Sequence, residues 1–336
     1  MSTYKFKNNI SLFLTIFFIS SCSSMDIGSL KFWENGEVDL EEPKKLEDFS
    51  SDYVVSTNWK ISSNNGENTL GNFIPSFNAN NLFIADSAGV ILSINSLSGE
   101  VNWEIQSNFL SSGIASGFGV LVVSDVDGNV IAHNQDDGSI LWSSNVKAEV
   151  LAPAAIDAKF VIIKTGSGEL LALDKNSGEL KWSYRSKLPN LTIRGSSSPV
   201  IVDNQIFVSF DNGRLGVFEL DSGFPVWDGA ISYASGPSEL ESLVDSDSSI
   251  KTFSMKSLQP SWSSSEYLNR EVSNASGFKG KLIVGDFEGY IHIIDPLNGS
   301  TIGRQKISKK PIKTIISRSN NFYAIDEGFN IFSLSL

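Results

Sequence analysis

The sequence predicts an all-β protein built as a β-propeller, and three observations support this fold class. A turn glycine is followed 14 residues later by a tryptophan, this spacing occurs four times, and the units that contain it are about 40 residues long. The four pairs are Gly89 and Trp103, Gly128 and Trp142, Gly168 and Trp182, and Gly213 and Trp227. A repeat of about 40 residues that contains four short strands has the size of a propeller blade.

The unit around Gly168 illustrates the four strands. Residues 159–164 before this glycine are rich in β-branched and aromatic side chains, and residues 170–174 after it are a short apolar run. A second turn, Asn-Ser-Gly-Glu, then leads into the segment that carries Trp182. Apolar runs of four to eight residues that are bounded by such turns indicate strands joined by hairpins. Glycine suits these turns because it adopts a positive φ without strain.

The number of blades follows from the same spacing. The turn glycines are at positions 89, 128, 168, 213, 289 and 328, and the step of 76 residues in this series corresponds to two blades with one marker missing. Fourteen residues before Trp262 lies Ser248, which marks a degenerate blade. The seven outer-strand markers are Trp59, Trp103, Trp142, Trp182, Trp227, Trp262 and Gly303.

The ring is expected to close through the N-terminal strand. Gly328 lies too close to the C-terminus for a complete blade, so residues 54–59 are predicted to supply the fourth strand of the last one. This pairing leaves no free sheet edge where the ring closes. We therefore expect about seven four-stranded blades. Residues 229–244 break the strand pattern, so the alternative is eight blades with one of them degenerate.

The N-terminus predicts export and lipidation. Residues 1–21 combine Lys5 and Lys7 with a ten-residue apolar run, which is too short to span a bilayer and is typical of a signal peptide. The following Ile-Ser-Ser-Cys resembles the bacterial lipobox, in which the cysteine, here Cys22, is diacylated. In such lipoproteins a serine after the cysteine, here Ser23, implies export to the outer membrane. The alternative is an ordinary signal peptide with an incidental cysteine.

The mature chain is then divided into two parts. Residues 22–50 are expected to be the lipidated cysteine and a flexible acidic tether, and residues 51–336 the propeller. Two acyl chains would hold such a protein at a membrane surface without a transmembrane helix.

Composition excludes several classes of function. A net charge of −12 argues against a nucleic-acid-binding surface, and two histidines with one cysteine cannot form the usual zinc cage. We therefore expect no metal, no cofactor and no catalytic residues. Residues 125–129 superficially resemble a calcium loop but are explained as a hairpin. His133 and His292 are expected to be structural, and Arg304, Lys306, Lys309, Lys310 and Lys313 to form a solvated basic edge.

The repeat itself resembles a known family. An apolar run ending in Leu-Asp, then Ser-Gly-Glu and a tryptophan four residues after the glycine, is similar to the PQQ-type propeller repeat. That family includes quinoprotein dehydrogenases and non-catalytic scaffolds. The dehydrogenases often carry a disulfide of adjacent cysteines beside the quinone, and the domain here has no cysteine, which favours the scaffold branch.

Together, the lipobox, the acidic tether and the propeller resemble the BamB lipoproteins of the outer-membrane β-barrel assembly machinery. Three segments match that family: Leu191–Pro199, Gly236–Asp247 and Val284–Tyr290. In BamB proteins the first two segments form the surface that holds the POTRA domains of the barrel subunit BamA. BamB proteins have eight blades, and this chain departs from them by about one, missing between Asp247 and Ile250.

The resemblance implies contact residues for that partner. They are Leu191, Ile193, Arg194, Asp245 and Asp247. Their chemistry agrees, because exposed aliphatic side chains beside an arginine, a planar donor of several hydrogen bonds, suit an interface anchor. The alternative is that the two aliphatic side chains pack beneath the connection and that Arg194 pairs internally with one of the two aspartates.

The sequence thus predicts a non-catalytic scaffold lipoprotein of the outer membrane that faces the periplasm and binds the POTRA domains of a BamA-like subunit. Unfolded outer-membrane protein chains could also bind its sheet edges by strand addition. The alternatives are a PQQ-dependent dehydrogenase and a scaffold of another envelope complex.

Overall fold

The fold was analysed in a computed structural model that describes residues 42–62, 73–187, 197–230 and 264–336. Residues Lys44–Leu336 form one compact unit. In the described part of the chain the secondary structure consists of strands, and no helix there is long and apolar enough to cross a membrane. The prediction of an all-β protein is confirmed.

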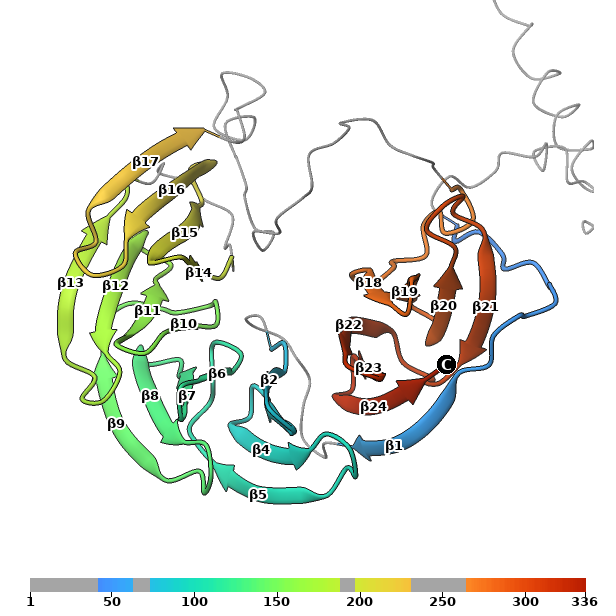
Figure 1. The fold of residues 1–336 in the computed structure, drawn as a ribbon, viewed down its shortest axis with the longest axis horizontal. Coiled ribbons are helices and arrows are strands. Elements are labelled where there is room, and N and C mark those ends of the chain that lie inside the picture. Colours follow the sequence, from blue (N-terminus) through green and yellow to red (C-terminus); the bar gives the residue numbers. More distant parts are fainter. Residues whose placement is uncertain (1–41, 63–72, 188–196, 231–263) are drawn as a thin grey trace, which may run out of the picture. The chain divides into compact units, whose positions relative to one another are not determined.

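The strands form six antiparallel sheets of four strands each in the described residues (Figure 1). The first sheet contains β2 (Ser76–Asn78), β3 (Asn81–Ala85), β4 (Val90–Asn95) and β5 (Val101–Gln106). The second contains β6 (Ala115–Gly117), β7 (Val120–Ser124), β8 (Asn129–Asn134) and β9 (Ile140–Asn145). The third contains β10 (Ala155–Ile156), β11 (Phe160–Lys164), β12 (Glu169–Asp174) and β13 (Leu180–Arg185).

The remaining sheets follow the same plan with one exception. The fourth contains β14 (Val200–Val202), β15 (Gln205–Phe210), β16 (Arg214–Glu219) and β17 (Pro225–Ala230). The fifth contains β18 (Ser276–Phe278), β19 (Lys281–Gly285), β20 (Tyr290–Ile294) and β21 (Thr301–Lys306). The closing sheet orders its strands β1 (Ser56–Ser62), β24 (Asn330–Ser335), β23 (Asn321–Asp326) and β22 (Ile312–Arg318).

The closing sheet confirms the predicted closure by the N-terminal strand. β1 pairs antiparallel with β24, and Trp59 lies opposite Ser333. Six of the seven outer-strand markers thus lie in six observed sheets. The seventh, Trp262, and its partner position Ser248 lie outside the described residues, as does the possible degenerate blade.

Apolar cores lie between neighbouring sheets. The central strands β3, β4, β7 and β8 bury nearly every side chain, whereas the outer strands alternate exposed and half-buried positions. One apolar cluster joins the closing, first and second sheets, and others join the second to the third, the third to the fourth, and the fifth to the closing sheet. Each sheet therefore depends on its neighbours for part of its core.

Four of the tryptophans dock their own sheet onto the next one. The indole N–H of Trp142 donates a hydrogen bond of 2.7 Å to the carbonyl of Lys175, in the last turn of the next sheet. The ring lies against Gly178 in the same turn, which has φ of 72° and where any Cβ would clash with the indole. The same arrangement recurs three times, as Trp59 with Ser96 and Gly99, Trp103 with Gln135 and Gly138, and Trp182 with Leu220 and Gly223. The repeat pattern thus encodes contacts between sheets.

This docking also explains the position that lost its tryptophan. Gly303 occupies the marker position in β21, and the sheet that follows is the closing one. The outer strand of that sheet is β1, which comes from the other end of the chain, so no turn joins it to β24. A tryptophan at position 303 would lack the turn on which the others dock.

The turn marker of the closing sheet corrects one prediction. Phe329, rather than Gly328, has the positive φ (58°) that glycine adopts at positions 89, 128, 168, 213 and 289. Asp326 lies three residues before it and accepts hydrogen bonds from the backbone N–H of Gly328 and Asn330. The glycine is therefore displaced by one residue from the repeat position, and Phe329 takes a left-handed conformation in its place.

The docking contact predicts the effect of changing Trp142, which is 7% exposed. Replacement by alanine should destabilise the protein by about 3–5 kcal/mol because it leaves a cavity between two sheets. Replacement by phenylalanine keeps most of the packing and loses mainly the hydrogen bond, which contributes about 1 kcal/mol. Urea unfolding of the mature chain would measure both, and equal effects of the two variants would contradict the docking role.

Candidate partner-binding face

Antiparallel order places the loops of every sheet on two faces. The turns between the first and second strands and between the third and fourth strands emerge on one face. The turn between the second and third strands and the connection to the next sheet emerge on the other, which we call the connection face. Hydrogen bonds confirm this placement, because the residue just after an outer strand donates its N–H to the carbonyl of the glycine in the turn between the second and third strands. The pairs are Ser107 with Gly89, Val146 with Gly128, Ser186 with Gly168, and Ile307 with Gly289.

The turns of the connection face are held by buried polar side chains. Asp125 Oδ1 accepts hydrogen bonds from the N–H of Asp127 and Asn129, at 3.0 and 2.8 Å. Asp86, Asp286 and Asp326 accept bonds at the equivalent positions, and Thr165 replaces aspartate in the third sheet. The carboxylate of Asp125 also accepts hydrogen bonds from the side chains of Asn129 and Asn108, so it is occupied by protein donors and residues 125–129 form a hairpin cap, as predicted.

All of the predicted contact residues lie outside the described residues. Leu191, Ile193 and Arg194 fall in 188–196, Asp245 and Asp247 fall in 231–263, and Cys22 falls in 1–41. The structure therefore informs on residues that flank the two predicted contact segments, of which Lys187, Ser197 and Ala230 lie close together.

The first flank is fixed by Asn212, in the turn between β15 and β16. Its Nδ2 donates to Ser186 Oγ at 3.1 Å and to the carbonyl of Lys187 at 2.8 Å. Its Oδ1 accepts the N–H of Arg214, which stabilises the turn itself. The end of the third sheet is thereby attached to the fourth.

The second flank is fixed by a buried ion pair. Lys164 Nζ lies 3.0 Å from Asp211 Oδ1 and 2.9 Å from Ser197 Oγ, and both charged side chains are almost fully buried. Ser197 Oγ in turn donates to the carbonyl of Ser209 at 3.0 Å. Removing water from such a pair is costly, so each charge needs the other and its hydrogen-bond partners. Ser197 is therefore held at the end of β11 and β15.

The third flanking residue, Ala230, is held by the same turn between β15 and β16. Ala230, the last residue of β17, lies opposite Arg214 in the sheet register, and Arg214 Nε contacts both carboxylate oxygens of Asp228 at 2.8 and 3.0 Å. The turn Phe210–Arg214 consequently holds both described ends of the first predicted contact segment and the N-terminal end of the second. Sequence reasoning missed this turn; the one available signal was Lys164, a single charge at the end of an otherwise apolar strand.

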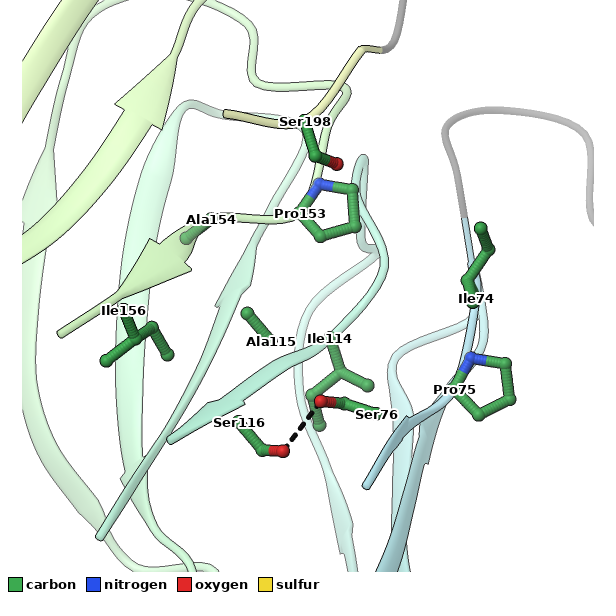
Figure 2. Close-up of a pocket in the computed structure, with 10 residues that line it drawn as sticks. All are labelled: Ile74, Pro75, Ser76, Ile114, Ala115, Ser116, Pro153, Ala154, Ile156 and Ser198. Carbon is green, nitrogen blue, oxygen red and sulfur yellow. Dashed lines mark hydrogen bonds between the residues drawn. The ribbon is translucent and has the colours of Figure 1, made fainter. Parts of the chain in front are cut away.

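A shallow depression of about 260 Å³ lies at the connection-face ends of the inner strands β2, β6 and β10 (Figure 2). Its lining is mostly aliphatic and proline, and Ser76 Oγ and Ser116 Oγ lie 2.6 Å apart across it. None of the ten lining residues is charged. They offer no carboxylate for a calcium ion and no cationic side chain for an anionic quinone.

The two histidines have structural environments. His133 Nδ1 donates to the carbonyl of Gly138 at 2.9 Å, and burial lowers the pKa of its ring despite this bond. His292 is fully buried beside Asp286. Within the described residues no group of three or more His, Cys, Asp or Glu side chains is arranged to hold a metal ion.

Known proteins resemble this chain over most of its length. The family model described as outer membrane protein assembly factor BamB matches residues 87–251. The protein of that name from Shewanella oneidensis is 25% identical over 90% of this chain and 91% of its own. The one from Escherichia coli strain K12 is 24% identical over 90% of this chain and 91% of its own.

A solved structure agrees on the fold. The crystal structure of BamB from Moraxella catarrhalis superposes with a TM-score of 0.71, at 20% identity, and covers 84% of this chain and all of that one. This likeness confirms the predicted propeller. Repeat pattern, family model and relatives of similar length agree, and the chain is similar to the BamB proteins, a family of PQQ-like repeat proteins.

Proposed function

We propose that the protein is a non-catalytic scaffold lipoprotein of the outer-membrane β-barrel assembly complex, which binds the POTRA domains of a BamA-like barrel subunit and aids insertion of outer-membrane proteins. The curated relatives are named as outer membrane protein assembly factors. The observation that carries the proposal is the turn Phe210–Arg214, because it anchors both ends of one segment that the family resemblance assigns to the partner and the N-terminal end of the other.

The partner contacts in this proposal are Leu191, Ile193, Arg194, Asp245 and Asp247. The two aliphatic side chains supply apolar area, and the arginine and aspartates supply charges of both signs for a complementary surface. A partner that contacts both segments at once would gain from anchored ends, since a pre-ordered loop loses less conformational entropy on binding.

The family is one of assembly factors rather than of enzymes, which confirms the expectation of a non-catalytic protein. A scaffold of a different envelope complex would share the fold and the anchor, and identification of the partner separates it from the first proposal. Anchoring through a diacylated Cys22 at the outer membrane, facing the periplasm, is part of the proposal and rests on the lipobox-like residues before this cysteine.

The contact surface is tested by Arg194→Glu. Reversing this charge should abolish co-purification of the barrel subunit from solubilised outer membranes, because the guanidinium would be replaced by a carboxylate in a desolvated contact. Identification of the co-purified proteins by mass spectrometry measures the loss.

The matched control is Arg318→Glu, an exposed arginine at the end of β22 on the opposite face. This control should retain the subunit. Full recovery with Arg194→Glu, or equal loss with both variants, would contradict the assignment of the site. Recovery of another envelope complex with the unaltered chain would contradict the proposed partner.

The anchoring turn is tested by Asn212→Ala. The change removes the bonds to Ser186, Lys187 and Arg214 and should weaken binding to the purified periplasmic domain several-fold, while stability falls by about 1–3 kcal/mol. Binding would be measured by titration calorimetry and stability by urea unfolding.

Asn145→Ala provides the comparison, because Asn145 makes similar side-chain bonds in the second sheet, to the carbonyl of Asp127 and the side chain of Asn129. Its affinity should be unchanged. If both variants bind like the unaltered chain, the turn does not position the contact segments.

The anchor is tested by Cys22→Ser in the Arg194→Glu background, where attachment through the barrel subunit is already removed. Arg194→Glu alone should fractionate with the outer membrane, and the double variant should move to the soluble periplasmic fraction because acylation requires the thiol. A double variant that stays with the membrane would favour an ordinary signal peptide and another mode of attachment.

A further inference from the structure

Residues 44–53, which we call the strap, lie along the fifth sheet before the chain enters β1. The N–H of Lys44 donates to the carbonyl of Leu268 at 3.1 Å, and the N–H of Asp52 donates to the carbonyl of Ile302, in β21, at 2.9 Å. Sequence analysis assigned most of this segment to the flexible tether, whereas here it is part of the compact unit.

Two arginines bind the strap by its backbone. Arg270 Nη1 donates to the carbonyl of Lys44 at 2.9 Å, and Arg304 Nη1 donates to the carbonyl of Glu47 at 2.8 Å. The guanidinium of Arg304 also lies over the ring of Phe49, 4.9 Å from its centroid. Most strap side chains are exposed, so these polar contacts, rather than burial of apolar area, hold much of the segment.

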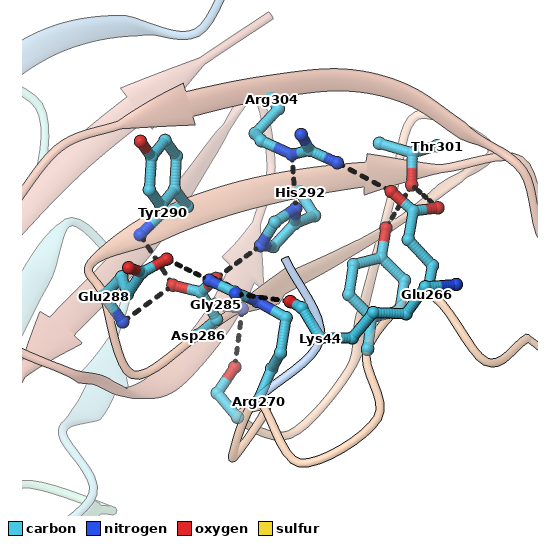
Figure 3. A network of polar contacts seen from close by, with 12 residues as sticks. Lys44, Glu266, Arg270, Gly285, Asp286, Glu288, Tyr290, His292, Thr301 and Arg304 are labelled. Carbon is cyan, nitrogen blue, oxygen red and sulfur yellow. Dashed lines mark hydrogen bonds and ion pairs between the residues drawn. The ribbon is translucent and has the colours of Figure 1, made fainter. Parts of the chain in front are cut away.

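The first arginine is itself held by the turn Val284–Tyr290 (Figure 3). Arg270 is 2% exposed, and its Nε and Nη2 lie 3.1 and 2.6 Å from Asp286 Oδ2. Its Nη2 also pairs with Glu288. Every nitrogen of the guanidinium therefore has an acceptor, and the one that faces the strap finds the carbonyl of Lys44.

The second arginine is held through His292. Arg304 Nη2 pairs with Glu266 at 2.6 Å, and its Nε donates to His292 Nδ1 at 3.2 Å. Since Nδ1 accepts, the ring proton is on Nε2, which donates to Asp286 Oδ2 at 3.0 Å. Both arginines thus depend on one carboxylate.

Asp286 remains ionised in this setting. Burial alone would raise the pKa of its carboxyl group, but hydrogen bonds from His292, Arg270 and the N–H of Tyr290 outweigh it and lower the pKa to about 2. In the second and closing sheets, the equivalent aspartates bond instead to asparagine and serine side chains. In the fifth sheet, the aspartate that caps the turn also binds an arginine side chain.

The missing tryptophan provides room for the strap. A Cβ built on Gly303, at the marker position, would lie 2.7 Å from Cδ1 of Ile293, in the neighbouring strand, and 3.1 Å from the Cβ of Tyr53 in the strap. Tyr53 therefore lies beside the position that other sheets fill with tryptophan, on the one described sheet whose outer strand carries no tryptophan.

We propose that the turn Val284–Tyr290, with Arg270 and Arg304, is a docking site for the strap, and that this docking fixes where the N-terminal chain leaves the propeller. The turn belongs to the connection face, so the chain leaves at Lys44 beside that face. If Cys22 carries the lipid, which rests on the proposed function, the chain between the lipid and its docked part spans 22 residues, from Cys22 to Lys44, rather than 34, from Cys22 to Ser56. Its greatest reach falls from about 115 Å to about 75 Å.

Spin labelling tests the docking in the mature chain without its lipid. Cys22 is the one cysteine of the chain, so Cys22→Ser permits a single label at Ser50→Cys in the strap. We expect a strongly restricted label. The rotational correlation time should fall several-fold when Arg270 and Arg304 are both replaced by glutamine.

The Arg270→Gln and Arg304→Gln changes leave Asp286 and Glu266 without their partners, so a second variant leaves the sheet intact. Replacing residues 44–49 by alternating glycine and serine removes Phe49 and raises the entropic cost of docking, and should release the label in the same way. A label at Asn176→Cys, in the exposed last turn of the third sheet, serves as the control and should not change.

A label at position 50 that is as mobile in the unaltered strap as in the glycine–serine strap would overturn the proposal. So would a label that stays restricted in the glycine–serine variant. Since this experiment uses soluble chain with serine at position 22, its result is independent of lipidation and of the barrel subunit, which the fractionation and co-purification experiments test separately.

Discussion

The structure depends on the docking of one sheet's tryptophan onto the last turn of the next sheet. A four-stranded sheet of this size cannot bury both of its faces alone, so its stability comes from its neighbours. The indole supplies apolar area and one donor, and the turn supplies a glycine that leaves space and a carbonyl that accepts, as Trp142 shows with Gly178 and Lys175. Because both partners occur at fixed positions of the repeat, the 14-residue spacing is the sequence record of a contact between successive units.

The same constraint explains why one sheet lacks the tryptophan of the repeat. At the closing sheet the outer strand comes from the other end of the chain, and the turn that would receive a tryptophan does not exist. Gly303 stands at that position, and the strap residue Tyr53 lies against it. Ring closure and strap docking are therefore two consequences of one topological fact. The loss of a marker residue, which in the sequence looks like decay of the repeat, coincides with a new contact.

The sequence pattern predicted the features that repeat and missed those that occur once. The outer-strand tryptophans, the closure by the N-terminal strand and the hairpin at residues 125–129 recur with the repeat or follow from its arithmetic, and they were found. The sequence pattern did not predict the pairs Lys164–Asp211 and Arg270–Asp286. Their members lie 47 and 16 positions apart, respectively, and no periodicity in the sequence connects them. Arg270 also binds Lys44, 226 positions away, which no local pattern can indicate. The family resemblance included the segment Val284–Tyr290 but assigned it no role. In the structure this segment holds Arg270, which binds the strap.

These unrepeated contacts differ from the docking contacts in kind as well as in number. A buried ion pair adds little net stability, because the free energy of removing both charges from water offsets most of their attraction, and an apolar pair of similar volume would serve the fold as well. Its distinctive property is specificity of position: a guanidinium donates hydrogen bonds at fixed angles, and a buried ammonium must lie within hydrogen-bond distance of its partners. Lys164 holds Ser197 and Arg270 holds Lys44, and both of these residues border segments on which the proposed function depends. The apolar contacts between sheets thus stabilise the ring, whereas the buried charges determine where chain segments leave it. That division is the one expected of a scaffold, whose activity lies in where its loops and its tether are presented.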